Sequence, residues 1–494
     1  MLKIKNKKSR PFLVVELLNS FTKRELADLA DFVSCDYHNT DRHVVDLLDV
    51  LREQVIYQRD FDETTQCITY SKIFPSKTIP NKSLNQQQKS LLLAKMAILL
   101  RLAETFLAHE SLKENVACKT ELLYEQLLKR NQVWLFKRQV TKDNKTLKSQ
   151  TEHGKAHYAH QFKVESGVLT YLYQNGLITK EDNLPKLIEA LDIYYILNKL
   201  DFHFTCLSLS RFSAQKSYDY RPMNAIEPLL QLPQYSNHPL IRTKLIATAL
   251  LQKNNYDDYV ELLNLLNAYA ENIPYQDLND FYKIAGNFCS KKITEGHSEF
   301  YQHAFDLYRI MDGKKLLQEG NFMPISKLKN IISVSCRLNE FDWAREIIEK
   351  YRSILQKQYA ESVYHFNMGA VAFYQNDFKT AIRHFIRVEK VNLSYDMDCR
   401  IMLLKSHYEL DNEYDERSIR TFLLSERFIQ SHKGLITRDK KAYKNFVRIL
   451  INIYNTRHGA GKMTPEKIQR KLEKLEFVSD KKWLEEKIAE LPKK

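Results

Sequence analysis

The chain has 494 residues, and its 44% hydrophobic content with 28 Tyr and 25 Phe excludes a globally disordered protein. Its 11 Gly and 12 Pro are too few for the many turns of a β-rich protein, so the composition predicts an all-α fold. The net charge of +14 lies mainly in three short stretches, which keeps nucleic-acid binding open as a function.

The seven cysteines are scattered without a CxxC motif or paired spacing, a pattern typical of reduced thiols in a cytosolic protein. The apolar run near the N-terminus is broken by Glu16 and lacks a small-residue cleavage site, so no signal peptide is predicted. No apolar window approaches the length of about 18 uncharged residues that a membrane span needs. We therefore expect a soluble, cytoplasmic protein with no membrane partner.

Residues 1–150 are predicted to form an N-terminal helical region. Within it, Thr22 and Glu25 have the spacing of a capping box, and apolar residues at helical spacing follow them. Two prolines disfavour helix in the stretch 70–80, which is predicted to be a connector. The polar stretch 142–154 is predicted to be a loop.

Residues 151–235 are predicted to form a helical connecting region. An apolar and aromatic helix is expected over 157–173, ended by Gly176, and a second helix over 184–200. A cluster of prolines then marks the boundary before the C-terminal part of the chain: Pro222, Pro228, Pro233 and Pro239.

The stretch 364–390 predicts two short antiparallel helices joined by a tight turn. Gly369 and Ala381 stand where the two helices must approach closely. Asn376 can adopt the left-handed conformation that ends the first helix, and Asp377 can cap the second. One such hairpin cannot bury its own apolar face, so neighbouring hairpins are expected.

The spacing of the hairpin resembles a tetratricopeptide (TPR) repeat, because five residues fall on positions that this repeat prefers: Asn367, Gly369, Phe378, Ala381 and Phe385. An aromatic residue recurs at the start of each predicted second helix: Tyr256, Tyr301, Phe341, Phe378 and Tyr414. The resemblance implies an α-solenoid of degenerate TPR-like helical hairpins over 236–457. The charged segment 458–494 is predicted to be a C-terminal capping helix.

The N-terminal half also resembles a known family. It contains the segments LLNSFTKRELADLADFV, SKIFPSK and LDIYYILNKL in this order, ahead of the hairpins and a closing WLEEK helix. This order resembles a family of uncharacterised bacterial cytoplasmic proteins that are all-helical and TPR-like towards the C-terminus. The motifs concern packing and capping, so the resemblance implies an architecture and no activity.

The first helix of each hairpin would line a concave face, and carrying over the groove-facing positions of the TPR family gives the candidate partner-binding residues. These are Lys329, Asn330, Ser333, Cys336 and Arg337 in one hairpin, and Phe366, Asn367, Ala370, Phe373 and Tyr374 in the next. Asn330 and Asn367 fall where TPR proteins often bind a peptide backbone. Phe366 replaces the lysine of the chaperone carboxylate clamp, which disfavours chaperone tails. The alternative is ordinary packing between repeats.

Two other groups of residues suggest alternative functions. His153, His157 and His160 are spaced as on one helical face and could ligate a transition metal. A hydrated helix start is the favoured explanation, so no metal site is predicted. The stretch 129–150 interleaves Trp134 and Phe136 with seven basic residues, as in single-strand nucleic-acid sites. The other basic stretches are 1–10 and 433–448, and buried aromatics between solvated lysines are the simpler alternative.

No glycine-rich phosphate loop, GxSxG or HExxH motif is present, so no catalytic residue or cofactor is predicted. The sequence favours a non-enzymatic scaffold that binds a protein or peptide in the concave groove of TPR-like repeats. The alternatives are a nucleic-acid-binding helical protein and a regulatory sensor whose groove binds a small peptide. The identity of the partner and the oligomeric state are left open.

Overall fold

The structure is a computed structural model. It describes the residues 13–56, 61–75, 83–177, 183–212, 221–389, 391–411, 415–431, 437–461 and 463–492. These residues form α-helices and no β-strand, which confirms the predicted all-α class. None of the described helices combines the length and the apolar content that a membrane span would need.

The chain divides into two compact units. The first comprises Met1–His203 and Tyr220–Tyr235, and the second comprises Phe204–Asp219 and Ser236–Lys494. The division predicted from the sequence into four parts stays a prediction. The helices of the first unit are α1 (Leu13–Asn19), α2 (Lys23–Ser34), α3 (Arg42–Ile56), α4 (Glu63–Ile73), α5 (Gln86–Glu114), α6 (Val116–Lys129), α7 (Val133–Ser149), α8 (Lys155–Gln174), α9 (Leu184–Phe212, up to His203), α10 (Arg221–Asn224), α11 (Glu227–Leu230) and α12 (Pro233–Ser236, up to Tyr235).

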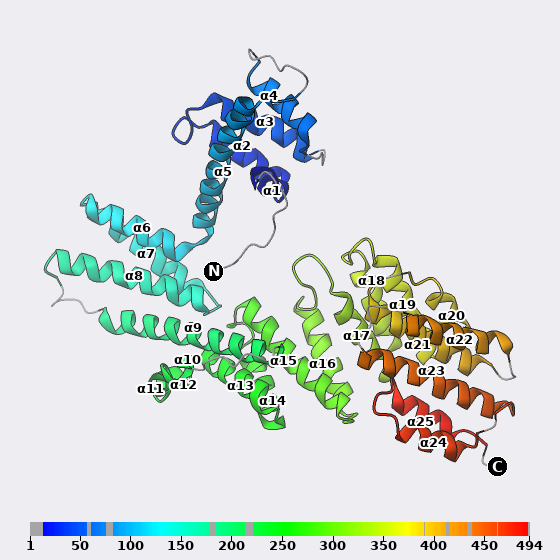
Figure 1. Cartoon of the computed structure of the whole chain (residues 1–494). Helices are drawn as coiled ribbons and strands as arrows, with labels where there is room; N and C mark the ends of the chain where they lie inside the picture. The colour runs from blue at the N-terminus through cyan, green and yellow to red at the C-terminus, as the bar shows by residue number, and fades with distance from the viewer. Residues whose placement is uncertain are drawn as a thin grey trace. The chain divides into compact units, whose positions relative to one another are not determined.

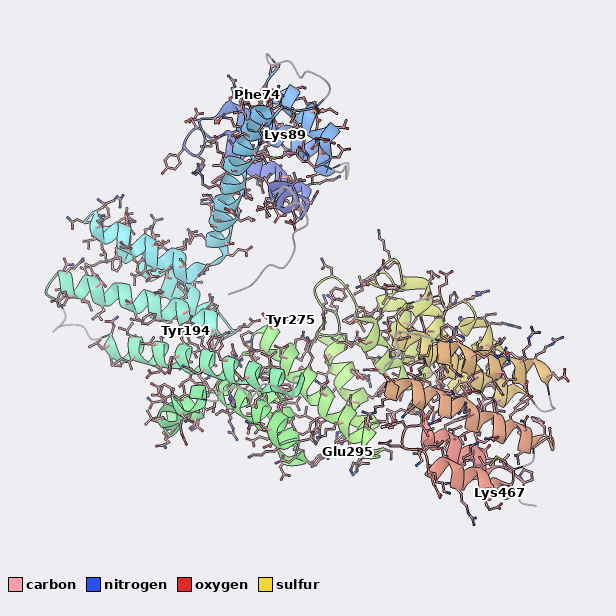
Figure 2. The ribbon with its side chains drawn as sticks, viewed as in Figure 1. Phe74, Lys89, Tyr194, Tyr275, Glu295 and Lys467 are labelled. Atoms are coloured by element: carbon pink, nitrogen blue, oxygen red, sulfur yellow. The ribbon has the colours of Figure 1, made fainter. Side chains whose placement is uncertain are left out.

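Helices α1–α5 share one hydrophobic cluster (Figure 1). The predicted capping box is confirmed, because the Thr22 hydroxyl accepts from the Glu25 amide and the Glu25 carboxylate accepts from the Thr22 amide. Phe74, labelled in Figure 2, is buried in the cluster directly after α4. Lys89, also labelled there, pairs with Glu63 at 3.0 Å and joins α5 to α4. The predicted connector 70–80 begins within α4, and its part beyond residue 75 lies outside the described residues.

The prediction of a loop over 142–154 is wrong, because helix α7 continues to Ser149. Asp143 and Leu147 lie four residues apart and are both buried, so this polar stretch has an inner face. The Tyr124 hydroxyl of α6 donates to Asp143 at 2.8 Å, which fixes that face against α6. Helices α6 and α8 approach closely at Gly167, where a Cβ atom would lie 2.3 Å from the Tyr124 ring.

The helices of the second unit after α9 are α13 (Pro239–Lys253), α14 (Tyr256–Tyr269), α15 (Tyr275–Thr294), α16 (Phe300–Gly313), α17 (Ile325–Arg337), α18 (Phe341–Arg352), α19 (Ala360–Tyr374), α20 (Phe378–Phe385), α21 (Leu393–Leu410), α22 (Glu416–Ser431), α23 (Thr437–Arg457), α24 (Pro465–Glu473) and α25 (Lys481–Ala489). Each packs mainly against its neighbours along the chain, as α17 does against α18 and α19.

The hairpin predicted over 364–390 is present as α19 and α20. Asn376 has a φ of 62° and ends α19, and the Asp377 side chain accepts from the Thr380 amide, as predicted. A Cβ atom at Gly369 would lie 2.8 Å from the Phe385 ring, so glycine permits the close approach of the two helices. Ala381 is completely buried.

The turns at two other hairpins have the same geometry. Asn254 between α13 and α14 has a φ of 53°, and Asn339 between α17 and α18 has a φ of 61°. The residues of the corresponding fourth turn, 412–414, lie outside the described part of the chain, together with the aromatic residue expected to open its helix.

The segment predicted to be one capping helix forms two, α24 and α25. The backbone leaves the helical conformation between them, and Asp480 has a φ of 45°. Trp483, Leu484 and Ile488 of α25 share one buried face, as the sequence indicates, and pack in a cluster with α21, α22 and α23.

Candidate functional site

A pocket of about 370 Å³ lies on the second unit, over the first helices of three successive hairpins. These helices are α17, α19 and α21, labelled in Figure 1, and the turn before α25 closes the pocket. Its lining residues are Lys329, Asn330, Ile332, Ser333, Phe366, Asn367, Ala370, Tyr374, Asp398, Ile401, Met402, Ser479 and Asp480.

The pocket brings together most of the partner-binding residues predicted from the sequence. Lys329, Asn330 and Ser333 come from α17, and a second group comes from α19: Phe366, Asn367, Ala370 and Tyr374. Arg337 and Phe373 do not line it, and neither does Cys336, which is buried. This placement shows that the residues are neighbours; partner binding itself stays a prediction.

Phe373 packs inside its own hairpin, with its ring centroid 5.5 Å from that of Phe378. Arg337 is exposed, and its guanidinium lies 5.2 Å from the centroid of the Tyr374 ring. No carboxylate pairs with Arg337 among the described residues. Arg337 is therefore an available positive charge beside the Tyr374 edge of the pocket.

Asn330 and Asn367 differ in their surroundings. Asn330 is exposed, and its side chain makes no hydrogen bond to any described residue. Asn367 is 1% exposed, and its Nδ2 donates to the Val363 carbonyl at 2.8 Å and to the Tyr395 hydroxyl at 3.1 Å. Its Oδ1 accepts no hydrogen bond from the part of the chain that the structure describes. Peptide binding by the two amides stays a prediction, and only Asn330 has free donors, because the Asn367 donors are already used within the fold.

Two ion pairs at the pocket each combine a lysine with an aspartate, so that their charges cancel. Lys329 pairs with Asp398 of α21 at 2.5 Å, and its ammonium lies 5.6 Å from the centroid of the Tyr395 ring. Lys405 pairs with Asp480. Burial and the nearby Arg337 lower the pKa of Lys405 to about 7, whereas the carboxylates of Glu486 and Glu409 oppose that shift. Arg337, beside the pocket, is a cation that no carboxylate of the described residues neutralises.

The sequence did not identify the residues contributed by α21 and by the C-terminal turn. Asp398, Ile401 and Met402 could have been found by extending the hairpin pattern one unit further, because α21 is the next first helix. Ser479 and Asp480 are far along the chain from the other lining residues and carry no comparable signal. Only the packing of α25 places them at the pocket.

The basic stretch 129–150 begins at the last residue of α6 and continues through the turn and α7. Trp134 is 71% exposed and Phe136 is 1% exposed, so the two aromatics have different roles. The Arg138 guanidinium lies 5.8 Å from the centroid of the Trp134 ring. The stretch 1–10 and the start of the stretch 433–448 lie outside the described residues.

The three histidines do not share one helical face. His153 precedes α8, and its ring centroid lies 4.6 Å from that of His157. His160 is buried and its Nε2 shares a hydrogen bond with the Thr120 hydroxyl at 3.2 Å. Within the described part of the chain, no group of three or more His, Cys, Asp or Glu side chains is placed to hold a metal ion.

Comparison of the chain with protein-family models, with curated proteins and with solved structures gives no match. Function is therefore inferred from the side chains of the two candidate regions, the pocket and the exposed face of α7.

Proposed function

We propose that this chain is a non-enzymatic scaffold that binds a protein or peptide in the pocket over α17, α19 and α21. The observation that carries the proposal is the gathering of predicted groove residues around one cavity that holds an exposed amide, Asn330. A peptide backbone both donates and accepts, so it can pair with the Asn330 side chain at about 0.5–1.5 kcal/mol net per hydrogen bond.

The proposal includes a TPR-like solenoid as the supporting architecture. It is supported by the left-handed asparagine at three equivalent turns: Asn254, Asn339 and Asn376. It is also supported by packing between neighbours along the chain, such as α17 with α19 and α19 with α21. In such an arrangement the first helices of successive hairpins line one continuous surface.

The charges favour a ligand with an acidic group. Lys329 is already paired with Asp398, so Arg337 is the cation available to attract a carboxylate. The aromatic ring of Tyr374 beneath the guanidinium is part of the lining and supplies apolar contact area.

The test is selection of a displayed random-peptide library on the immobilised full chain, followed by binding measurements on single variants. Ser333→Trp fills the pocket from an exposed position and should abolish binding of the selected peptides. The matched control is Ser290→Trp, an exposed serine of α15 that does not line the pocket. Peptides that bind both variants equally would show that the pocket is not the site.

Asn330→Ala and Arg337→Gln refine the same experiment. Asn330→Ala should weaken every selected peptide, and Arg337→Gln should weaken acidic peptides more than neutral ones. Asn367→Ala is unsuitable, because it removes buried hydrogen bonds to Val363 and Tyr395 and therefore tests folding rather than binding.

A second function, binding of single-stranded nucleic acid on α7, is favoured by the exposure of Trp134 beside Arg138. An exposed indole can stack on a base while neighbouring cations neutralise phosphates. The test is retention of a single-stranded oligonucleotide on a filter at low and high salt, since phosphate contacts weaken steeply with ionic strength. Retention lost in the double variant Lys137→Glu and Arg138→Glu would support it, and no retention by the parent chain at low salt would exclude it.

A further inference from the structure

The part of helix α9 that belongs to the first unit, up to His203, is apolar on two opposite faces. One face is buried in the unit: Ala190, Ile193, Ile196, Leu197 and Leu200. The opposite face is exposed and carries Ile188, Leu191, Tyr195 and Phe202, with Ile188 53% and Phe202 61% exposed. A helix that is apolar all round is normally covered on all sides, and an exposed stripe of this kind marks an interaction surface.

The spacing of the exposed stripe is that of a coiled-coil seam. The stripe residues 188, 191, 195, 198 and 202 alternate steps of three and four along α9. This alternation keeps a stripe facing one partner helix along its whole length. The fourth position is Asn198, a polar residue of the kind that fixes register in coiled coils.

Charged residues flank the seam on one side. Asp192 and Lys199 are separated by one heptad and both are partly exposed. When two identical helices run antiparallel about a two-fold axis, the same flank of each helix meets. In the register that places Asp192 beside Lys199 of a second copy, Leu191 faces Phe202 and Tyr195 faces Asn198 of that copy. One register therefore satisfies the charges and the seam together.

The hydrogen bonds of the single chain are compatible with this register. Asn198 Nδ2 donates to the Tyr194 carbonyl at 2.7 Å, which leaves its Oδ1 as an acceptor for the Tyr195 hydroxyl of the second copy. Asp192 accepts from the Tyr235 hydroxyl at 2.6 Å through Oδ2, and no described side chain forms an ion pair with this carboxylate. The Lys199 ammonium lies 5.2 Å from the centroid of its own Tyr195 ring, next to the seam.

We propose that the exposed face of α9 binds the same face of a second copy of this chain, antiparallel, and forms a two-fold symmetric homodimer. An isologous contact of this type is closed, since each residue that contributes to one half of the interface recurs in the other half.

The experiment is sedimentation equilibrium of the full chain over a micromolar concentration range. We expect twice the mass of one chain for the parent protein and the mass of one chain for Phe202→Lys and for Leu191→Lys. The matched control is Ile386→Lys, an equally exposed apolar residue of the second unit, which should leave the dimer intact. Far-ultraviolet circular dichroism of each variant checks that the helices remain folded.

Charge exchange tests the antiparallel register. Lys199→Glu places a carboxylate at position 199 of each copy beside Asp192 of the other copy. This repulsion should raise the dissociation constant of the dimer roughly threefold to tenfold. Adding Asp192→Lys to that variant should restore the parent value within about twofold. If the double variant does not fold, oxidation of a mixture of Leu191→Cys and Phe202→Cys chains replaces it, with mixed disulfide dimers as the expected product.

A parent chain that stays monomeric throughout the range would overturn the proposal. So would a dimer that persists in both Phe202→Lys and Leu191→Lys, because it would then form on another surface. Disulfides that join like with like in the mixed oxidation would overturn the antiparallel register.

Discussion

Helices α7 and α9 of the first unit expose large aromatic side chains, whereas the hairpin of α19 and α20 buries three phenylalanines. Trp134 of α7 and Phe202 of α9 are largely exposed. In the hairpin, Phe366, Phe373 and Phe385 are buried against one another or against neighbouring helices. The two regions therefore use aromatic residues for different purposes.

The difference shows where each region can recognise a partner. A hairpin that has used its aromatic area internally can offer only a pocket, whose specificity comes from a few polar groups such as Asn330. A helix with an exposed apolar stripe offers a long apolar surface rather than a cavity, and another helix can cover such a surface. Five measurements test the difference between buried and exposed positions, in order from the largest expected effect to the smallest.

The largest effect is expected at α7, where neighbouring aromatics have opposite exposure. Phe136→Ala should lower the free energy of unfolding by about 3–5 kcal/mol, since it empties a core position beside Tyr124 and Tyr171. Trp134→Ala should change it by less than about 0.5 kcal/mol. Denaturant unfolding of both variants measures the difference, and equal losses would contradict the exposed position of Trp134.

The next effect concerns the buried pair at the pocket. Asp480→Asn leaves the Lys405 ammonium buried without its carboxylate and should cost about 3 kcal/mol near neutral pH. The matched control is Glu485→Gln, which removes the exposed partner of Lys481 on the same helix and should cost under about 0.5 kcal/mol.

The free energy of unfolding of Asp480→Asn should also depend on pH, because Lys405 can lose its proton in the folded state. Burial lowers the pKa of Lys405 from the ordinary 10.5 to about 7 in the folded parent chain, and removing the Asp480 carboxylate does not raise it. The unfolded state then binds more protons between these values, so the free energy of unfolding of Asp480→Asn should rise with pH across that interval relative to Lys405→Met. If the free energies of unfolding of the two variants differ by the same amount at every pH, the pKa of Lys405 is not lowered by folding.

A smaller loss is expected where α19 and α20 touch. Ala381→Leu inserts three carbon atoms into a fully buried position and should cost about 1–3 kcal/mol. Ile386→Leu, at the exposed end of the same hairpin, is the control and should be neutral. Thermal unfolding of Ala381→Leu identical to that of the parent would contradict the close contact of the two helices.

The smallest effect has the opposite sign. Gly286 in α15 has open space around the position of a Cβ atom, so Gly286→Ala should stabilise the protein by about 0.5–1 kcal/mol. Gly369→Ala should instead destabilise, because the added carbon meets the Phe385 ring. The comparison of the two variants by denaturant unfolding separates a glycine required by packing from one that is not.

Local features were predictable from the sequence. The capping box of Thr22 and Glu25, the left-handed Asn376 and the close approach at Gly369 each depend on residues within one turn or one hairpin. The all-helical class was predictable from composition, because the chain has too few Gly and Pro for the turns of a β-rich protein. The error at residues 142–154 arose because their polarity hides an inner face, which the buried contact of Asp143 with Tyr124 defines.

By itself, the sequence determined the helical class, several helices and caps, and most of the residues on α17 and α19 that line the pocket. These depend on periodicity and on neighbours a few residues apart. Tertiary structure alone decided that Asp480 pairs with Lys405, that Asn367 uses its donors internally and that one apolar face of α9 is left uncovered. Each of these facts depends on which distant helix lies alongside, and chain spacing carries no record of that.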